Sequence, residues 1–412
     1  MPWKETQKMD QRLEFAMKAL RCDNFTELCR GYGISRKTGY KWLERFTRGG
    51  SEGLIELSRR PKRPSNELPE AVVCEMIRLK QAHPHWGPRK IRELYARKHG
   101  GKAPSESSFK RVLMKAGMTQ PRRQRRAKQG GRIGRGRKAS SVNEVWTVDF
   151  KGWWHDPKGT RVEPLTVRDE FSRMILELRA VANARTETIR ACFERLFEAH
   201  GLPVALRSDN GPPFASPQGL LGLSRLSAWW LALGIDLERG RPGCPQDNGA
   251  HERMHLDIRR ELEAGRIGRD QDAFDLWREE FNRERPHEAL GMACPAEIYQ
   301  SSPRPYQGTP ESLDYGAMST RRVHKRGTIT YRGESMGISA ALAGWDVGLS
   351  PCQDGMIEVW FSHLLLGHID PSISSFSPAT YGTQASAGDS APLHRPPKPG
   401  PSSHPISTTS KP

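Results

Sequence analysis

The run "VWTVDF" at residues 145–150 places one carboxylate, that of Asp149, inside an otherwise apolar stretch. The β-branched and aromatic residues of this run predict a core strand. An isolated ionised carboxylate is very unfavourable away from water, so a chain that buries one must protonate it, pair it or bind a cation to it. Any fold of this chain must therefore provide Asp149 with such a solution.

The residues that follow predict a mixed sheet. Two further strand-like runs, "RVEPLTVRDEF" and "RMILELRAV", are joined at a tight turn in "DEFS". Three antiparallel strands followed by alternating helices and strands are typical of an α/β domain, which we assign to residues 143–300. The later predicted elements are helices at 186–199, 220–233, 249–264 and 270–284, a strand that ends in "RSDNG" and a short strand at 235–238.

Positive charge is concentrated in the first third of the chain. The net charge is +18, and residues 1–140 contain 35 Lys and Arg against 13 Asp and Glu. This asymmetry predicts that the N-terminal region binds a polyanion, with a solvated basic face as the alternative. No run of 18 apolar residues and no apolar segment of a secretory signal is present, which predicts a cytosolic protein without a membrane partner.

Two regions of this basic third have the pattern of helix-turn-helix units. In "NFTELCRGYGISRKTGYKWLERF", Asn24 or Thr26 caps a first helix, Gly33 lies in the turn and Ser35 caps a second helix. We assign a DNA-binding domain to residues 1–57, and a three-helix bundle without DNA binding is the alternative. The DNA contacts expected near the start of the second helix are Arg36, Lys37, Tyr40 and Lys41.

A linker at 58–68, a second helix-turn-helix domain at 69–120 and a basic flexible linker at 121–142 follow. In the second domain one helix starts near Pro88, and Ser105 or Ser107 caps another. Nine Lys and Arg within residues 121–138 predict a segment that is disordered when free and lies along phosphates when bound. The expected DNA contacts of these segments are Arg89, Lys90, Lys110, Arg111, Arg122, Arg123, Arg125 and Arg126.

The C-terminal part is predicted to contain a linker at 301–322, a small β-barrel at 323–370 and a disordered tail at 371–412. The barrel follows from the alternation of apolar and polar residues with Gly turns, and the tail from its Ser, Pro, Gly and Thr content. The seven cysteines are scattered and form no CxxC pair. The sequence therefore predicts neither a disulfide framework nor a structural zinc site.

Two further acidic residues occupy special places beside Asp149. Asp209 ends a predicted strand in "RSDNGPPF", and Glu252 lies near the start of a helix after "RPGCPQDNGA". Other acids nearby have simpler explanations, because helix caps, turns and exposed helix faces commonly carry carboxylates. These are Asp247 as a helix cap, Asp169 as part of the "RDEFS" turn and Glu261 as a solvent-facing helix residue.

Four motifs in one order carry a family resemblance: "WTVDF", "SDNGPPF", "RPGCPQDNGAHERMH" and "FNRERPHEALGMACPAEIY". Through them, residues 143–300 resemble the DDE transposases of insertion sequences, which have a retroviral-integrase-like, ribonuclease H-like catalytic core. The resemblance implies a catalytic triad at Asp149, Asp209 and Glu252. The interval between Asp209 and Glu252 is longer than is common in integrases, and the extra length falls in "SPQGLLGLSRLSAWW".

The chemistry of phosphodiester cleavage gives an independent reason for three acids. Two divalent ions can stabilise both the attacking and the leaving oxygen, and Mg²⁺ or Mn²⁺ prefers such hard oxygen ligands. We expect Asp149 to bridge two ions, with Asp209 on one and Glu252 on the other. Arg253 as a phosphate contact and His287 as a group that orients a helix or a phosphate are each equally well explained by structural roles.

The resemblance implies a DNA transposase that binds the terminal inverted repeats of its element. It would cleave the strand end to leave a 3′-hydroxyl and join that end to target double-stranded DNA, as a homodimer or higher oligomer, in the bacterial cytosol and associated with the nucleoid. Two alternatives stay open. One is a catalytically inactive DNA-binding regulator or transposase remnant, and the other is a simple nuclease with the same core.

Overall fold

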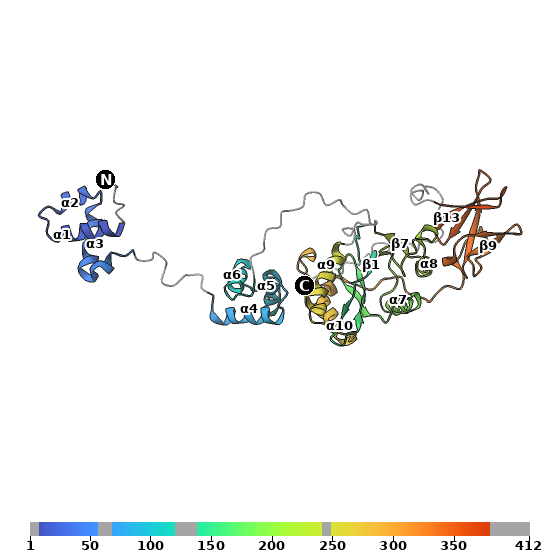
Figure 1. The fold of residues 1–412 in the computed structure, drawn as a ribbon, viewed down its shortest axis with the longest axis horizontal. Helices are drawn as coiled ribbons and strands as arrows, with labels where there is room; N and C mark the ends of the chain where they lie inside the picture. Colours follow the sequence, from blue (N-terminus) through green and yellow to red (C-terminus); the bar gives the residue numbers. More distant parts are fainter. Residues whose placement is uncertain (1–7, 57–67, 120–137, 241–248, 380–412) are drawn as a thin grey trace, which may run out of the picture. The chain divides into compact units, whose positions relative to one another are not determined.

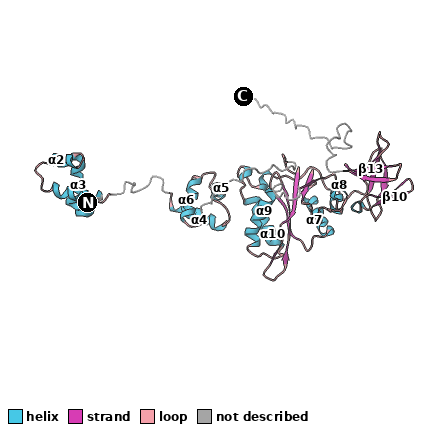
Figure 2. Ribbon diagram, turned by 45° about the horizontal axis from the view of Figure 1, so that its top comes forward, coloured by secondary structure: helices cyan, strands magenta, loops and turns pink. Residues whose placement is uncertain are grey.

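The computed structural model describes residues 8–56, 68–119, 138–240 and 249–379. The chain divides into two compact units, residues 1–72 and residues 73–412. Figure 1 labels the helices and strands, and Figure 2 separates helices from strands by colour. No helix in these described ranges is both long enough and apolar enough to cross a membrane.

The first unit contains the predicted helix-turn-helix. Its helices are α1 (Lys8–Ala19), α2 (Phe25–Gly31) and α3 (Arg36–Gly49), followed by a 3₁₀ turn at Gly50–Leu54. The side chains of Asn24 and Ser35 cap α2 and α3, each accepting a backbone hydrogen bond of 3.2 Å. Gly33 has a φ of +64°, which favours glycine in the turn. The predicted caps and turn are therefore confirmed.

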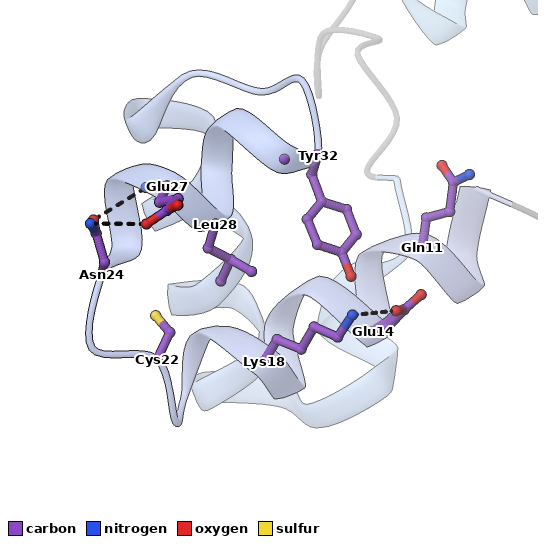
Figure 3. Close-up of a pocket in the computed structure, with 9 residues that line it drawn as sticks. Gln11, Glu14, Lys18, Cys22, Asn24, Glu27, Leu28 and Tyr32 are labelled. Atoms are coloured by element: carbon purple, nitrogen blue, oxygen red, sulfur yellow. Dashed lines mark hydrogen bonds and ion pairs between the residues drawn. The ribbon is translucent and has the colours of Figure 1, made fainter.

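A groove of about 780 Å³ lies beside α1 and α2 of this unit (Figure 3). Lys18 pairs there with Glu14 at 2.7 Å and lies over the ring of Tyr32. Glu27, which also lines the groove, receives a side-chain hydrogen bond from Asn24. Because its lysine is already paired, this groove lacks the excess positive charge of a phosphate-binding surface.

The second unit begins with the other predicted helical group. Its helices are α4 (Glu70–Ala82), α5 (Pro88–Lys98) and α6 (Glu106–Lys115). Pro88 occupies the first turn of α5, and the Ser105 side chain caps α6 by accepting from the Ser108 amide at 3.2 Å. Phe109 and Leu113 of α6, four residues apart, are both buried on one face of the helix.

The α/β region contains one mixed five-stranded sheet. In spatial order the strands are β5, β4, β1, β6 and β7, and β1 is antiparallel to β4 but parallel to β6. The run that carries Asp149 forms a strand, as predicted, and this strand is the central one of the sheet. The strands are β1 (Val145–Phe150), β4 (Pro164–Asp169), β5 (Ile175–Ala180), β6 (Ala205–Ser208) and β7 (Asp236–Arg239), beside a small hairpin of β2 (Trp154–His155) and β3 (Arg161–Val162).

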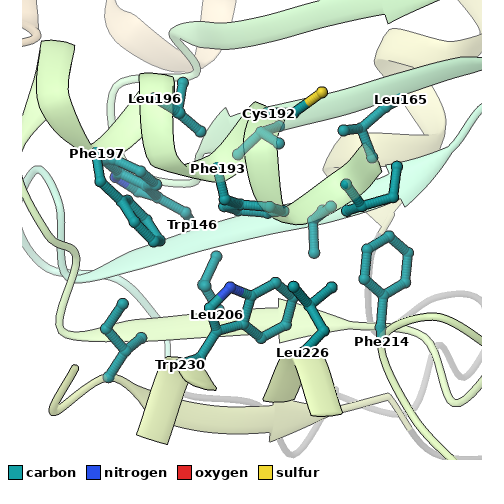
Figure 4. Close-up of a cluster of buried hydrophobic side chains, with 14 of the residues drawn as sticks. Trp146, Leu165, Cys192, Phe193, Leu196, Phe197, Leu206, Phe214, Leu226 and Trp230 are labelled. Atoms are coloured by element: carbon teal, nitrogen blue, oxygen red, sulfur yellow. The ribbon is translucent and has the colours of Figure 1, made fainter. Parts of the chain in front are cut away.

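Helices cover both faces of this sheet (Figure 1). Trp146 and Leu206 pack with Phe193 and Trp230 from α7 (Thr186–His200) and α8 (Arg225–Ala232), as Figure 4 shows. A second apolar cluster joins β5 to α9 (Gly249–Ile258) and α10 (Gln271–Glu279). Each of these two helices continues into a π-helical turn, Arg259–Glu263 and Glu280–Glu284, before the 3₁₀ turn Glu288–Leu290 and α11 (Pro295–Ile298).

Helix α8 starts later than predicted. Residues Leu220–Gly222 form a separate 3₁₀ turn in which Leu221 has a φ of +50°, a conformation that a continuous helix excludes. Ser224 then caps α8 and forms a reciprocal capping box with Ser227. The apolar run from 220 to 233 is therefore divided by a cap rather than folded as one helix.

The C-terminal region forms two sheets. An antiparallel sheet has the order β14-β13-β12-β11-β8, and β9 pairs only with β10 among the described residues. The predicted alternation is confirmed in β12, whose residues are buried and half-buried in turn. The strands are β8 (Ser319–Arg322), β9 (Thr328–Tyr331), β10 (Glu334–Gly337), β11 (Asp346–Pro351), β12 (Ile357–Phe361), β13 (Leu364–Asp370) and β14 (Ser375–Pro378), with a 3₁₀ turn at Ala340–Leu342.

Two expectations for this region need correction. No ladder joins the edge strands β8 and β14 within the described residues, so a closed barrel is not seen there. Strand β14 lies inside the segment predicted to be a disordered tail, and Phe376 packs there against the apolar cluster of the sheet. Composition missed this strand because an edge strand needs only one paired side and tolerates Ser and Pro.

Candidate active site

Strand β1 holds Asp149 in a rigid position at the centre of the sheet. Its backbone pairs with Thr166 of β4, and the Thr166 hydroxyl donates to the Asp149 carbonyl oxygen at 2.8 Å. The Asp149 side chain is 31% exposed. The carboxylate therefore lies at the rim of the core, partly withdrawn from water.

Asp209 follows β6, the strand parallel to β1. Parallel neighbours end at the same edge of a sheet, so Asp209 emerges at the edge where β1 also ends. The Asn210 side chain donates to the Gly240 carbonyl oxygen at 2.7 Å and holds this turn. A Cβ atom at Gly211 would lie 3.0 Å from the Asp209 carboxylate, so glycine leaves that side of the carboxylate open.

Glu252 is exposed in the first turn of α9, and two contacts fix this helix on the sheet. The buried guanidinium of Arg168 donates to the Ala250 carbonyl oxygen at 2.7 Å. His251, the residue before Glu252, is fully buried against β1 and β4. Glu252 thus belongs to a helix end that is anchored through the two residues before it.

The negative charges of Asp209 and Glu252 act on Asp149. Burial is the largest cause that raises the pKa of Asp149 from its ordinary value of 3.8 to about 7; the negative charges of Asp209 and Glu252 add to it, and a backbone hydrogen bond from Phe150 opposes it. The three residues come from β1, the end of β6 and α9. Asp209 and Glu252 therefore lie close enough for their charges to act on Asp149, but among the described residues the three carboxylates do not form a group of ligand atoms within 4.8 Å of one another.

This gathering of like charges fits a divalent cation. With a pKa of about 7, Asp149 would be about half protonated near neutral pH without a cation, because burial and then the charges of its neighbours disfavour its ionised form. A cation beside the three carboxylates reverses that preference and keeps them ionised. Carboxylate oxygens are ligands that suit Mg²⁺ and Mn²⁺, so the donor set matches the expected metal.

Two histidines that the sequence analysis did not single out lie beside Asp149. The Nδ1 atom of His255 lies 3.9 Å from Asp149 Oδ2. Donor atoms of Asp149, His251 and His255 all lie within 4.8 Å of one another. The signal that could have revealed them is the spacing in "HERMH", which places both histidines on one face of α9.

Hydrogen bonds set the tautomers of these rings. The Thr166 hydroxyl donates to a carbonyl, so its oxygen accepts from Nε2 of His251 at 2.6 Å and from Nε2 of His255 at 2.9 Å. Burial lowers the pKa of His255 to about 3, and the His251 pKa also falls well below its usual range. A neutral His255 protonated on Nε2 presents a lone pair on Nδ1 toward Asp149.

The "HExxH" spacing also occurs in zinc metalloproteases, and the geometry argues against that activity here. The Nδ1 atom of His251 is 2.7 Å from the Thr147 hydroxyl and its Nε2 is 2.6 Å from that of Thr166. Both ring nitrogens are engaged and the residue is fully buried. His251 therefore anchors α9 rather than presenting a free metal ligand.

The competing acids have structural roles. Asp169 accepts from the Ser172 amide at 2.7 Å and from the Asn143 amide at 2.8 Å, which confirms that it sets the turn after β4. Glu261 is not solvent-facing as expected, because the π-helical turn directs it inward to Trp277 Nε1 at 2.7 Å and to Arg285 at 3.2 Å. Asp247 lies outside the described residues.

The predicted contacts of the first helix-turn-helix lie at the start of α3. Arg36, Lys37, Tyr40 and Lys41 are all exposed. The Tyr40 ring stacks on Phe25 at 4.3 Å, and the Lys41 ammonium lies 5.0 Å from the Trp42 ring. The first turns of α3 thus present three cations and one aromatic ring to solvent.

The predicted contacts of the second helical group divide into two kinds. Lys110 and Arg111 are exposed on α6. Arg89 instead pairs with Glu106 at 3.3 Å and with Glu288 at 3.2 Å. Burial, followed by the charge of Arg285, lowers the pKa of Lys90 to about 8. Arg89 and Lys90 therefore face residues of their own unit.

The remaining predicted residues are divided between the site and the core. Arg253 is exposed beside Glu252, with Asp257 3.8 Å away. His287 packs against the Phe281 ring, and burial lowers its pKa to about 2, so it is a neutral structural residue. The predicted contacts that lie outside the described residues are Arg122, Arg123, Arg125 and Arg126.

Comparison with known proteins gives a family for each region. Residues 11–62 match a helix-turn-helix domain, and residues 38–113 match a homeodomain-like domain. Residues 139–245 and 233–295 match two models of the integrase core domain. Residues 318–375 match the C-terminal domain of IS481 family transposases.

Curated relatives belong to insertion elements. The uncharacterized 31.7 kDa protein of insertion element IS407 from Burkholderia multivorans is 27% identical over 237 residues, which cover 56% of this chain and 80% of that protein. The uncharacterized 39.2 kDa protein of insertion element IS476 from Xanthomonas euvesicatoria is 26% identical over 237 residues, which cover 56% of this chain and 64% of that protein.

Two solved structures are also similar. The catalytic core domain of BIV integrase is 25% identical, with a TM-score of 0.30, and the match covers 38% of this chain and 93% of that one. The catalytic core domain of HTLV-2 integrase in complex with magnesium is 18% identical, with a TM-score of 0.30, and the match covers 39% of this chain and 99% of that one.

The class of protein follows from the mixed sheet, the matched domains and the acidic edge, by which we mean the sheet edge with Asp149, Asp209 and Glu252. The chain has an integrase-like, ribonuclease H-like core preceded by helix-turn-helix DNA-binding domains. Within that class the comparisons support a DDE transposase of the insertion-sequence type, because the C-terminal domain matches that of IS481 family transposases and the curated relatives belong to insertion elements.

Proposed function

We propose that this transposase binds the inverted repeats at the ends of its element, cleaves a strand at each end and joins the ends to target DNA. The observation that carries the proposal is the placement of three acids, with Asp149 on β1, Asp209 after the parallel strand β6 and Glu252 in the first turn of α9, where the charges of the latter two act on Asp149. Structural ion pairs normally combine opposite charges, whereas neighbouring carboxylates favour a bound cation.

In this proposal Asp149, Asp209 and Glu252 hold two Mg²⁺ or Mn²⁺ ions. The ions, when bound, supply Lewis acidity and neutralise the negative charge that develops on the reacting phosphate. The chain itself supplies rigidity, since β1 fixes Asp149 and the anchored start of α9 fixes Glu252. His255 is a positioning residue through packing, because its ring is held by the Thr166 hydroxyl and lies 3.9 Å from the Asp149 carboxylate.

Two successive substitutions at phosphorus account for cleavage and joining. Water attacks the phosphodiester at the end of the element, the P–O3′ bond breaks and the element keeps a free 3′-hydroxyl. That hydroxyl then attacks a phosphodiester of the target, forming a new P–O bond and releasing a target 3′-hydroxyl. Neither step needs ATP or a covalent intermediate with the protein, since each bond broken is matched by one formed.

The helical regions deliver the DNA. Lys37 and Lys41 at the exposed start of α3 suit phosphates and base edges in the major groove. Exposed Arg253, beside Glu252, is placed to contact a phosphate near the reacting bond. Because two element ends must be joined together, we expect a homodimer or higher oligomer on the DNA, working in the bacterial cytosol.

An oligonucleotide assay tests this function. Wild-type protein with Mg²⁺ or Mn²⁺ should nick and join duplexes that carry the inverted repeats flanking its gene. Asp149→Asn should abolish both reactions while end binding stays nearly intact, and Glu198→Gln, which removes a charge from the exposed face of α7, should leave them unchanged.

The assay also separates the alternatives. Binding of the ends without any nicking would establish the inactive regulator. Nicking without joining would establish a simple nuclease. Equal loss of binding and cleavage in Asp149→Asn would mean that Asp149 is a structural residue.

A further inference from the structure

The C-terminal sheet carries a second cluster of metal-ligand atoms, remote in sequence from the acids. The Cys352 sulfur, a carboxylate oxygen of Glu358 and a ring nitrogen of His368 all lie within 4.8 Å of one another. All three side chains are half-buried. None of them belongs to the proposed site of Asp149, Asp209 and Glu252, and the sequence contains no CxxC spacing that would indicate a metal site here.

The strand register explains how three separate residues meet. Glu358 of β12 lies directly opposite His368 of β13 and also opposite Ser350 of β11. Cys352 is two residues beyond Ser350, so it projects from the same face. The intervening residues Ile357, Val359 and Ile369 are buried on the other face. The cluster therefore occupies the outer face of a sheet whose inner face is apolar.

Two further contacts position the ligands. The Trp360 indole N–H donates to Glu358 Oε2 at 2.9 Å, which holds the carboxylate as hydrogen-bonded partners of metal ligands do. The Cys352 amide donates to the Met356 carbonyl oxygen at 2.8 Å across the turn between β11 and β12. Gly355, with a φ of +82°, allows this turn. The thiol is thus held close to the carboxylate by the backbone.

We propose that Cys352, Glu358 and His368 form a Zn²⁺ site. Zn²⁺ is a borderline-soft ion that binds thiolate, imidazole and carboxylate, whereas Mg²⁺ requires oxygen ligands, so this site and the acidic edge select different metals. One thiolate and one carboxylate balance the charge of the ion. Three protein ligands leave one tetrahedral position for water or for another ligand.

Binding of the ion has a defined proton balance. Burial and the nearby Glu358 raise the pKa of the Cys352 thiol, so the free thiol keeps its proton. Coordination forms the Zn–S bond and releases that proton to solvent. The bound ion ties the turn after β11 to β12 and β13. This inference is independent of the proposed DNA chemistry.

Co²⁺ in place of Zn²⁺ gives a direct test on the full-length protein. A thiolate ligand produces an intense near-ultraviolet charge-transfer band with Co²⁺, which carboxylates at the acidic edge do not produce. With the thiols reduced, we expect an absorption band that saturates as Co²⁺ is added and that disappears when Zn²⁺ displaces the Co²⁺. Trp360→Phe should weaken metal binding by roughly 10–100-fold.

Matched variants decide the assignment. Cys352→Ser and His368→Asn should each abolish or strongly reduce the band, whereas Cys74→Ser, at an exposed cysteine of α4, should leave it unchanged. Circular dichroism of each variant checks that it folds. Absence of the band in wild-type protein, or its survival in both folded Cys352 and His368 variants, would overturn the site.

Discussion

Replacing Asp149 by Asn should stabilise the metal-free protein. The pKa of Asp149 is raised in the folded state, from 3.8 to about 7. Its contribution to stability is therefore fully present below about pH 4 and is lost as the pH rises toward 7. A shift of that size corresponds to about 4 kcal/mol, which solvent screening of a side chain 31% exposed reduces to roughly 2 kcal/mol.

Thermal unfolding in EDTA measures this effect. We expect the transition of the catalytic core in Asp149→Asn to lie about 4–8 °C above the wild type at pH 8, because about 1 kcal/mol shifts a domain of this size by roughly 2–4 °C. Near pH 4 the two proteins should unfold at nearly the same temperature. Saturating Mg²⁺ should reverse the order at pH 8, since only the wild type gains about 2–4 kcal/mol from the bound ions.

Glu198→Gln is the matched control, because it removes one negative charge from an exposed position of α7 in the same domain. It should change neither the pH dependence nor the response to Mg²⁺. If Asp149→Asn is less stable than the wild type at pH 8 in EDTA, or if the difference does not grow between pH 4 and 7, then the carboxylate is not electrostatically strained and the reasoning fails.

Three further outcomes follow from the same structure. Arg207→Ala should lower the free energy of unfolding by roughly 3–5 kcal/mol in urea titrations, because it leaves Glu170 and Glu238 partly buried without their shared cation; a loss below 1 kcal/mol would contradict this. His255→Ala should weaken Mn²⁺ binding by about 10–100-fold in titration calorimetry with little change in end binding. Unchanged Mn²⁺ binding would show that the ring does not position Asp149. Lys41→Ala should reduce the slope of log affinity against log salt by about 1 in DNA-binding titrations, and an unchanged slope would exclude a phosphate contact.

The sequence predicted the elements that follow local rules. The caps of α2, α3 and α6 and the turn at Gly33 were predicted correctly, because capping side chains and a positive φ depend on neighbouring residues alone. The break before α8 was missed, since an apolar run hides a cap that is made by two serines. Glu261 was misjudged because the π-helical turn changes which face of the helix is buried.

The residues of the proposed metal sites also divide into those that the sequence reveals and those that it does not. The three acids could be proposed from the sequence, because each stands within a motif that resembles those of DDE transposases. His255 and the cluster at Cys352 could not, since their partners are set by how α9 lies on β4 and by the register of β12 against β13. The spacing of residues along the chain does not predict such contacts.

By itself, the amino-acid sequence determined which segments would be helices or strands, where positive charge would gather and that Asp149 would need a neutralising partner. Only the tertiary structure decided that β1 is the central strand, that β6 runs parallel to it and that α9 returns to the same edge. The physical reason is the range of the interactions. Caps, turns and periodicity act over a few residues, whereas the raised pKa of Asp149 comes first from its burial in the assembled sheet and then from charges 60 and 103 positions further along the chain.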